Sequence, residues 1–318
     1  MPASTPDPHP VHDPVREVVA SLSQPEPELH CKWLYDAEGS DLFEQITRLP
    51  EYYLTRCEIE ILDRHADAMA AALGPGVVLV ELGSGSARKT VPLLAALESP
   101  AAWVPIDISE SALTDAVTRM QRRFDGLPIV PVAADYTADV ALPPLPDGPR
   151  AGWFPGSTIG NFDREDAVAF LGRIATLLGP GGHLLIGVDV QKNPSVLIPA
   201  YDDAQGVSAR FNLNLLAHVN DTTGANFDLA HWRHRATWDP ALSCVELAVV
   251  ATCDTTVTVG GTTFSFAAGD VVRTERSHKW TRPAFDAIAA EAGYTPVAGW
   301  SDSGDRYDVR LLRVATPG

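Results

Sequence analysis

The sequence has few cysteines, no long apolar run and a shortage of basic residues, and each of these absences disfavours a class of protein. Only four cysteines occur in 318 residues. None forms a CxxC pair, which disfavours a disulfide scaffold and favours a reducing, cytoplasmic location. No apolar run approaches the roughly 20 residues that a membrane span requires. Acidic residues outnumber basic residues by 41 to 24, which disfavours binding to a nucleic-acid backbone.

Two further features narrow the possibilities. The chain begins MPASTPDPHP, which is rich in proline and has no apolar segment typical of a secretory signal, so we interpret residues 1–7 as a disordered tail. His231 and His234 have a spacing that could suit a metal, but no third ligand accompanies them and we expect no metal site. We therefore expect a monomeric protein that acts on a small molecule, without nucleic acid or membrane.

Strands and helices alternate in the order typical of an α/β sheet. Buried runs predict strands at 77–82, 103–107 and 183–190, a third strand that ends at Asp135, and a fourth within 152–162. Amphipathic runs between them predict crossover helices, so we expect a doubly wound parallel sheet. Upstream of the sheet, two capping-box patterns predict where helices start: Asp41 with Glu44, and Thr55 with Glu58.

The pattern changes after Lys192. Residues 195–220 read as helical, and residues 243–266 alternate with period two about Gly260 and Gly261, which predicts a hairpin. The α/β rhythm resumes with a helix at 282–294. We therefore predict one α/β domain of residues 57–192 and 279–318, and a second, α+β domain of residues 8–56 and 193–278.

A glycine-rich turn follows the first predicted strand. A dinucleotide fingerprint would read GxGxxG, but Gly83 and Gly85 are followed by Arg88 at the third position. What remains, Glu-Leu-Gly-Ser-Gly, is the form of the loop in class I S-adenosylmethionine-dependent methyltransferases. A GxG turn by itself is more often only a tight corner between a strand and a helix, so the interpretation depends on the residues that follow.

Acidic residues end the next two predicted strands. Asp107 is placed to accept hydrogen bonds from two ribose hydroxyls. Asp135 can accept from an adenine amino group, and Tyr136 can pack beside the ring. Either aspartate could instead cap a helix. Three strands end in acidic residues, and the LGPGGHLLI segment follows. Together these features favour an S-adenosylmethionine site over the alternative that the GxG turn is only a tight corner.

The segment GSTIGNF, in the region of the fourth strand, bears on the methyl acceptor. Methyltransferases that act on flipped bases or peptide amides carry Asn or Asp, two prolines and an aromatic residue here, and this chain does not. Asn161, expected at the end of the strand, can both donate to and accept from a small polar substrate.

The chain resembles the histidine-specific S-adenosylmethionine-dependent methyltransferases, which make trimethylhistidine (hercynine) in ergothioneine biosynthesis. The similarity runs from about residue 30 to the C-terminus. Six stretches carry it: KWLYDAEGSDLFEQITRLPEYYLTR, VELGSGSARKT, PIDIS, GSTIGNF, AYDDAQGVSARFNLN and RTERSHKW. The first and the last are specific to this family.

The resemblance implies a fold, an activity and a set of site residues. It implies a class I, Rossmann-like methyltransferase domain joined to an α+β substrate-binding domain. It implies that Asn161 orients the substrate amine, with no covalent nucleophile. The cofactor contacts that follow from the loop and the resemblance are Gly83, Ser84, Gly85, Lys89, Asp107, Asp135 and Tyr136. The implied substrate contacts are Tyr52 and Tyr201 at the carboxylate, Asn161 at the amine, Glu275 and Ser277 at the imidazole, and Tyr35 and Phe43 as pocket walls.

Three alternatives remain open at this point. A related enzyme could methylate another free amino acid or small amine, because one or two pocket residues can change the acceptor. An α/β oxidoreductase that uses a dinucleotide is disfavoured by the missing third glycine. A protein that binds the cofactor without turnover would have the same loop.

Overall fold

The computed structural model describes residues 13–85 and 87–316, and these residues form two compact units. The first unit comprises the described chain up to Glu51, together with Leu197–Trp238 and Val245–Glu275. The second comprises Tyr52–Val196, Asp239–Cys244 and the chain from Arg276 onward. The predicted tail of residues 1–7 lies outside the described residues. Among those described, no helix has both the length and the apolar character of a membrane span.

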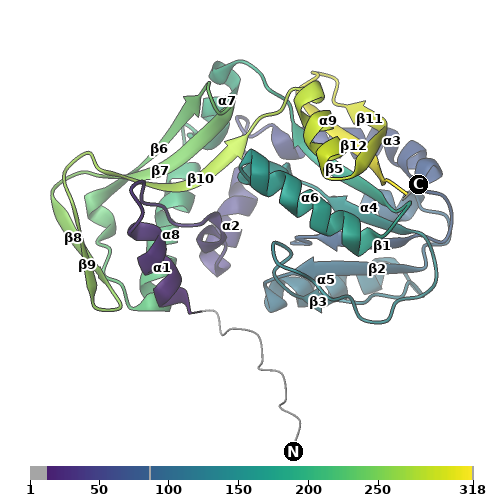
Figure 1. Cartoon of the computed structure of the whole chain (residues 1–318), viewed down its shortest axis with the longest axis horizontal. Coiled ribbons are helices and arrows are strands. Elements are labelled where there is room, and N and C mark those ends of the chain that lie inside the picture. Colours follow the sequence, from purple (N-terminus) through teal and green to yellow (C-terminus); the bar gives the residue numbers. More distant parts are fainter. Residues whose placement is uncertain (1–12, 86, 317–318) are drawn as a thin grey trace, which may run out of the picture. The chain divides into compact units, whose positions relative to one another are not determined.

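A seven-stranded sheet forms the centre of the second unit (Figure 1). Its order is β11-β12-β5-β4-β1-β2-β3, and every pair from β5 to β3 is parallel, whereas β12 is antiparallel to both of its neighbours. This confirms the predicted doubly wound, class I methyltransferase sheet. The strands are β1 (Val78–Leu82), β2 (Ala102–Asp107), β3 (Val132–Ala133), β4 (Arg150–Phe154), β5 (His183–Asp189), β11 (Tyr294–Ser301) and β12 (Tyr307–Val314).

Strand order reverses between β1 and β4, and this reversal positions the site. In open α/β sheets the loops that follow the two strands at such a reversal diverge, which leaves room for a ligand at their carboxyl ends. β1 is followed by the glycine-rich turn, and β4 is followed by the segment that contains the short helix η2 (Thr158–Asn161). The predicted cofactor loop and Asn161 therefore leave adjacent strands at the same end of the sheet.

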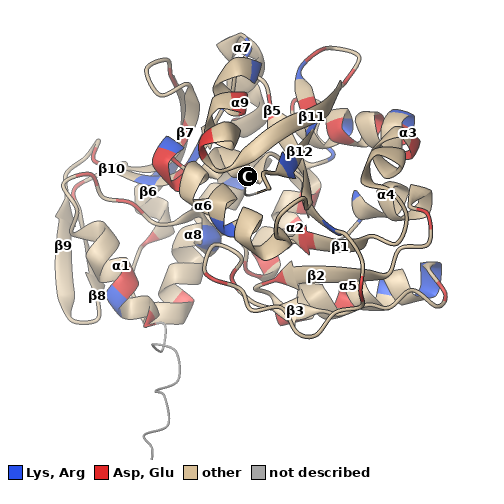
Figure 2. Cartoon of the chain, turned by 45° about the vertical axis from the view of Figure 1, so that its right-hand side comes forward, with Lys and Arg blue, Asp and Glu red and all other residues tan. Residues whose placement is uncertain are grey.

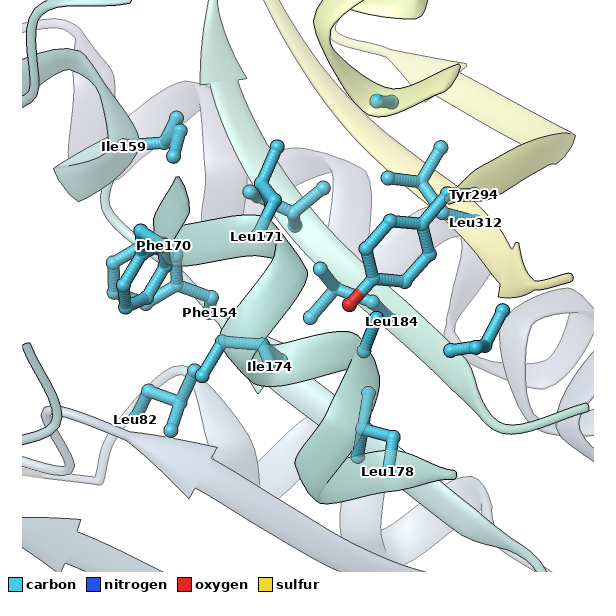
Figure 3. Close-up of a cluster of buried hydrophobic side chains, with 14 of the residues drawn as sticks. Leu82, Phe154, Ile159, Phe170, Leu171, Ile174, Leu178, Leu184, Tyr294 and Leu312 are labelled. Carbon is cyan, nitrogen blue, oxygen red and sulfur yellow. The ribbon is translucent and has the colours of Figure 1, made fainter. Parts of the chain in front are cut away.

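Helices cover both faces of this sheet. On one face, α6 (Arg164–Leu178) and α9 (Arg282–Glu291) pack on side chains such as Leu82, Phe154 and Leu184, which are almost fully buried (Figure 3). On the other face, Thr90 at the start of α4 (Thr90–Ala96) contacts Glu81, which alternates with Leu82 along β1. The remaining helices of this unit are α3 (Leu54–Leu73) and α5 (Glu110–Arg123). Both carry acidic as well as basic side chains (Figure 2).

The first unit contains the three-stranded sheet β10-β7-β6 and the hairpin β8-β9. The hairpin turns at Gly260 and Gly261, as predicted, and both glycines have positive φ. Its elements are α1 (Pro14–Leu22), η1 (Cys31–Leu34), α2 (Ala37–Ile46), α7 (Pro194–Tyr201), α8 (Val207–Thr223), η3 (Leu229–His231), β6 (Trp232–Asp239), β7 (Cys244–Ala251), β8 (Thr255–Val259), β9 (Thr262–Phe266) and β10 (Val271–His278). Parts of four of these elements belong to the second unit: the start of α7, the last residue of β6, the first residue of β7 and the last three residues of β10.

Both capping-box predictions were wrong. α2 begins at Ala37, and its cap is Asp36, whose carboxylate accepts the backbone N–H of Gly39 at 2.7 Å. α3 begins at Leu54, so Thr55 lies inside the helix. Glu58 does not reach back to the helix start, because its side chain is fully buried and is bound to other elements.

Two further sequence predictions needed correction. The third strand is only the two residues of β3, so Asp135 lies just beyond it. The helical segment 195–220 is two helices, because Gly206 adopts a left-handed conformation and Asp203 accepts backbone N–H groups at the start of α8.

Candidate functional site

The turn after β1 brings backbone close to an aromatic ring. Gly83 has φ of 72°, and its N–H and that of Ser84 both donate to the carbonyl of Ile106 on the neighbouring strand. A Cβ added to Gly83 would lie 3.3 Å from Cε1 of Tyr136. Glycine is favoured here because a side chain would be strained by the backbone and would crowd this ring. Ser86, in the same turn, is outside the described residues.

The aspartate that follows β2 is bound to the glycine turn. Asp107 accepts the N–H of Gly85 at 2.9 Å through one oxygen and the N–H of Ser109 at 3.0 Å through the other. Ser109 itself caps α5, so the alternative that Asp107 is a helix cap is wrong. The structure thus brings three of the predicted cofactor residues together with Tyr136: Gly83, Gly85 and Asp107.

Asp135 and Tyr136 have separate environments. Asp135 accepts the backbone N–H of Thr137 at 2.8 Å and its hydroxyl at 2.6 Å, which is a local turn and not a helix cap. The Tyr136 ring packs edge-on against Phe154, with centroids 5.7 Å apart. Tyr136 is therefore held between the glycine turn and the end of β4.

The acidic residue at the end of β1 does not face the turn. Glu81 is fully buried, where it accepts hydrogen bonds from the Thr90 hydroxyl and from Nε1 of Trp103 at 2.8 Å. Burial raises the pKa of Glu81 to about 8, against the opposing effect of these two hydrogen bonds. Its role is to join β1, α4 and β2 behind the loop.

Lys89, a predicted cofactor contact, is held by a buried carboxylate. Its Nζ lies 2.7 Å from Oε2 of Glu58, whose side chain is fully buried, while 23% of the Lys89 side chain is exposed. Glu58 also accepts the N–H of Gly156, at 3.0 Å to each oxygen, and the hydroxyl of Tyr307 at 2.9 Å. A Cβ at Gly187 would overlap both Glu58 and Tyr307, so glycine in β5 leaves room for this cluster.

Glu58 is a functional candidate, although its sequence pattern predicted only a helix cap. It links the loop after β1, through Lys89, to the loop after β4, through Gly156. A signal was available in the sequence: Glu58 lies on the apolar stripe of its helix, four residues after Leu54 and three before Ile61. A charge at such a position indicates a buried partner.

The loop after β4 carries Asn161, which was expected at the end of the strand. It lies instead in η2, beyond a left-handed turn at Ser157. Gly160 packs on the end of β10: an added Cβ would lie 2.8 Å from the carbonyl of His278 and 3.6 Å from Oγ of Ser277. The structure therefore brings the residue before Asn161 against Ser277, another predicted substrate residue, in the second unit.

A second buried cluster lies beneath this loop. Asp189, at the end of β5, accepts the Tyr53 hydroxyl at 2.7 Å and is paired with Lys192 and, at 2.9 Å, with Lys279. Its backbone N–H donates to Oγ of Ser157 at 2.9 Å. Tyr52, the predicted carboxylate contact, precedes Tyr53 and is 7% exposed. Tyr53 thus binds the buried aspartate.

The other predicted substrate residues belong to the first unit. Tyr35 and Phe43 meet edge-on with centroids 5.7 Å apart, and Phe211 of α8 lies within 6 Å of both. Tyr201 ends α7, and its carbonyl receives Nε2–H of His234 at 2.9 Å. Glu275 is half-buried on β10, two residues before Ser277, so the two side chains leave this strand on the same face.

The two histidines with a metal-like spacing have other partners. Nδ1 of His234 accepts a hydrogen bond from Nδ2 of Asn212 at 2.9 Å, and its Nε2 donates to the carbonyl of Tyr201, so both ring nitrogens have partners. Burial lowers the pKa of His234. His231 lies 3.2 Å from the Thr255 hydroxyl. Within the described chain, no group of three or more His, Cys, Asp or Glu side chains could hold a metal ion.

Comparison with known proteins shows the family. The family model for histidine-specific, S-adenosylmethionine-dependent methyltransferases matches residues 15–314. A histidine N-alpha-methyltransferase of Mycobacterium tuberculosis is 39% identical over 302 residues, which cover 93% of each chain. The chain belongs to this family.

Two other relatives match most of this chain. Ergothioneine biosynthesis protein 1 of Neurospora crassa is 32% identical over 300 residues, which cover 88% of this chain and 32% of that protein. N-methyltransferase imqF of Aspergillus flavus is 28% identical over 326 residues, covering 96% and 86%. As a member of the histidine-specific family, the protein is an N-methyltransferase, and S-adenosylmethionine is its cofactor.

Proposed function

We propose that the protein trimethylates the α-amino group of L-histidine to give hercynine, a step of ergothioneine biosynthesis. The family and the names of its relatives support histidine as the acceptor. The observation that supports the proposal most is the close approach of Gly160, the residue before Asn161, to Ser277. Gly160 and Asn161 lie on the loop after β4, next to the strand that precedes the glycine turn. We assign cofactor binding to the second unit and substrate recognition mainly to the first. All four cysteines are free thiols, which supports a cytoplasmic location.

The glycine turn suits S-adenosylmethionine on three grounds. The bare Cα of Gly83 allows close approach beside Tyr136. The hydroxyl of Ser84 is buried and has no hydrogen-bond partner among the described residues, so a ligand could complete it. Asp107 presents a carboxylate fixed by two N–H donors, which suits ribose hydroxyls. We propose that Gly83, Ser84, Gly85, Lys89, Asp107, Asp135 and Tyr136 hold the cofactor.

The proposed substrate contacts follow the chemistry of histidine. Phenol hydroxyls of Tyr52 and Tyr201 donate to the carboxylate, and the Asn161 amide orients the amine. Glu275 and Ser277 bind the two ring nitrogens, because a carboxylate accepts from a ring N–H and a hydroxyl can complement the other nitrogen. We propose that Tyr35 and Phe43 wall the pocket.

Positioning carries most of the catalysis in this proposal. When bound, S-adenosylmethionine supplies a methyl group on a positively charged sulfur, which a nitrogen lone pair can attack directly. An α-amine ordinarily has a pKa of about 8, so a fraction of it is neutral without a strong base. The chain then needs only to hold the amine in line, and correct orientation alone accelerates such reactions greatly.

A second candidate acceptor is another free amino acid or small amine. The similarity to imqF, which is named only as an N-methyltransferase, supports this alternative. The two candidates differ in the role of Glu275, which reads the imidazole only if histidine is the acceptor.

A panel of free amino acids with S-adenosylmethionine separates the candidates. We expect rapid methyl transfer to histidine and little to the others. Glu275→Ala should raise the KM for histidine by about tenfold or more, since a hydrogen bond to a charged group contributes roughly 1.5–3 kcal/mol. Arg273 pairs with Glu28, and Arg273→Met provides a control on the same strand. Faster transfer to another amino acid would refute the proposal.

A further inference from the structure

Ser157, in the loop after β4, has a backbone conformation that serine rarely adopts. Its φ is 59° and its ψ is 26°, and Gly156 before it also has positive φ. A glycine adopts this left-handed conformation without strain, whereas a residue with a side chain is disfavoured there. Such residues persist where the surrounding contacts hold them, and they cluster at functional sites.

The hydroxyl of Ser157 takes the place of a strand partner for the end of β5. β4 and β5 pair in parallel up to Phe154 and Ile186, so β4 has ended before the level of Asp189. The backbone N–H of Asp189, a fully buried residue, donates instead to Oγ of Ser157 at 2.9 Å. A buried N–H without an acceptor is costly, so this contact ties the loop after β4 to the end of β5.

The same serine begins the short helix that contains Asn161. The carbonyl of Ser157 accepts the N–H of Gly160 at 2.8 Å, within η2. Gly160 lies so close to the end of β10 that an added Cβ would be 2.8 Å from the carbonyl of His278, which leaves η2 little room to shift toward that strand. The helix is therefore fixed by Ser157 where it begins and by close packing at the residue before Asn161.

We propose that Ser157 is a positioning residue for methyl transfer. Its hydroxyl, bound to the N–H of Asp189, holds the left-handed turn that sets the direction of η2 and so the place of Asn161. This inference rests on the proposed function, in which the Asn161 amide orients the substrate amine. In-line attack depends on the angle at which the amine meets the methyl group, so a small displacement of Asn161 lowers the rate of transfer more than it lowers binding.

The test is the steady-state kinetics of full-length Ser157→Gly with L-histidine and S-adenosylmethionine, at a temperature at which the variant is folded. Glycine keeps the left-handed conformation accessible and removes the hydroxyl. We expect kcat to fall about tenfold or more, with the KM for S-adenosylmethionine within about twofold of wild type. A serine with a structural role alone would lower stability and leave kcat unchanged.

Ser99→Gly is the matched control. Ser99 is an exposed serine with φ of 48° in the loop before β2, so this variant also removes a hydroxyl from a left-handed turn. Its kcat should equal that of wild type. A similar fall in kcat for Ser99→Gly and Ser157→Gly would overturn the inference, because the loss would then not depend on the loop that carries Asn161.

A double-variant cycle with Asn161→Ala tests whether Ser157 acts through Asn161. The rate of the first turnover, measured with enzyme in excess over S-adenosylmethionine, reports on slow variants as well. Ser157→Gly should lower this rate much less in the Asn161→Ala background than in wild type, since residues that act as a unit are not additive. An equal loss in both backgrounds would overturn the inference.

Amide hydrogen exchange of the wild-type protein keeps the inference falsifiable if Ser157→Gly does not fold. The Asp189 amide should exchange as slowly as the preceding amides of β5, and rapid exchange would show that Ser157 does not anchor the turn. Wild-type kcat in Ser157→Gly overturns the inference but leaves the proposed function intact. A wild-type protein that transfers no methyl group to histidine refutes the proposed function itself.

Discussion

Replacing Glu58 with glutamine should destabilise the second unit and weaken cofactor binding together. Glu58 accepts from Gly156, Tyr307 and Lys89, so both oxygens are surrounded by donors. A glutamine amide has one NH₂ group in place of an oxygen, and either orientation of the amide directs that group at a donor. The variant therefore leaves a buried donor unpaired and separates Lys89 from its counterion.

The magnitude follows from burial. Breaking a buried ion pair by removing one partner costs about 3–5 kcal/mol. Because 23% of the Lys89 side chain is exposed, water can partly rehydrate its ammonium, and we expect a loss near the lower end, about 3 kcal/mol. Tyr307→Phe is the matched control, since it removes one hydrogen bond and keeps the carboxylate with its charge. That control should lose about 1 kcal/mol.

Two measurements check this prediction: urea unfolding, and calorimetric titration with S-adenosylmethionine. If Glu58 holds Lys89 for the cofactor, Glu58→Gln should weaken cofactor binding by about tenfold or more, which corresponds to a lost hydrogen bond to a charged group. The double variant Glu58→Gln, Lys89→Met should be less destabilised than the sum of the single variants. Equal stability of Glu58→Gln and Tyr307→Phe would refute the reasoning, and unchanged cofactor affinity would show that Glu58 does not act through Lys89.

Two further variants test the glycine turn and the strand behind it. Gly83→Ala should cost roughly 1–2 kcal/mol of stability because of the positive φ, and its Cβ should also displace Tyr136. Gly85→Ala is the control, because Gly85 also has positive φ but its Cβ would meet no atom within 4 Å. We expect the two variants to have similar unfolding curves and Gly83→Ala to bind the cofactor more weakly; equal affinities of the two variants would contradict the role given to Tyr136. For Glu81, whose folded pKa is raised to about 8, the folded state binds the proton more tightly than the unfolded state, so its contribution to stability is greatest below the unfolded value and declines as pH rises toward 8. Glu81→Gln removes this decline, and the unfolding free energy of the variant relative to wild type should rise by about 1.4 kcal/mol per pH unit between pH 5 and 8; a difference that is constant with pH would show that Glu81 is ionised throughout.

The sheet was predictable because its signals are local. Strands such as β1, β2 and β5 are short buried runs bounded by turns, and the hairpin at Gly260 and Gly261 depends on two adjacent residues with positive φ. The two-residue strand β3 and the edge strand β11 have weaker signals, because few of their side chains are buried. For this reason β11 was not predicted from the sequence.

The buried clusters could not be derived from local patterns. The sequence Thr-x-x-Glu has the same form whether the glutamate caps a helix or points into the core. Glu58 takes its partners from positions 98 and 249 residues away, so only the folded chain shows which case holds. Lys279 lies in a stretch of polar residues, and its contact with Asp189 depends on the pairing of distant segments. The cofactor turn was easier to recognise, because its chemistry is contained in one strand, one turn and the ends of neighbouring strands.

The central claim is tested most directly by the product formed from L-histidine and S-adenosylmethionine. Purified protein should convert histidine through singly and doubly methylated forms to a product with three added methyl groups, and fragmentation should place all three on the α-nitrogen. Transfer to a ring nitrogen, termination after one methyl group, or no methylated histidine would contradict the account.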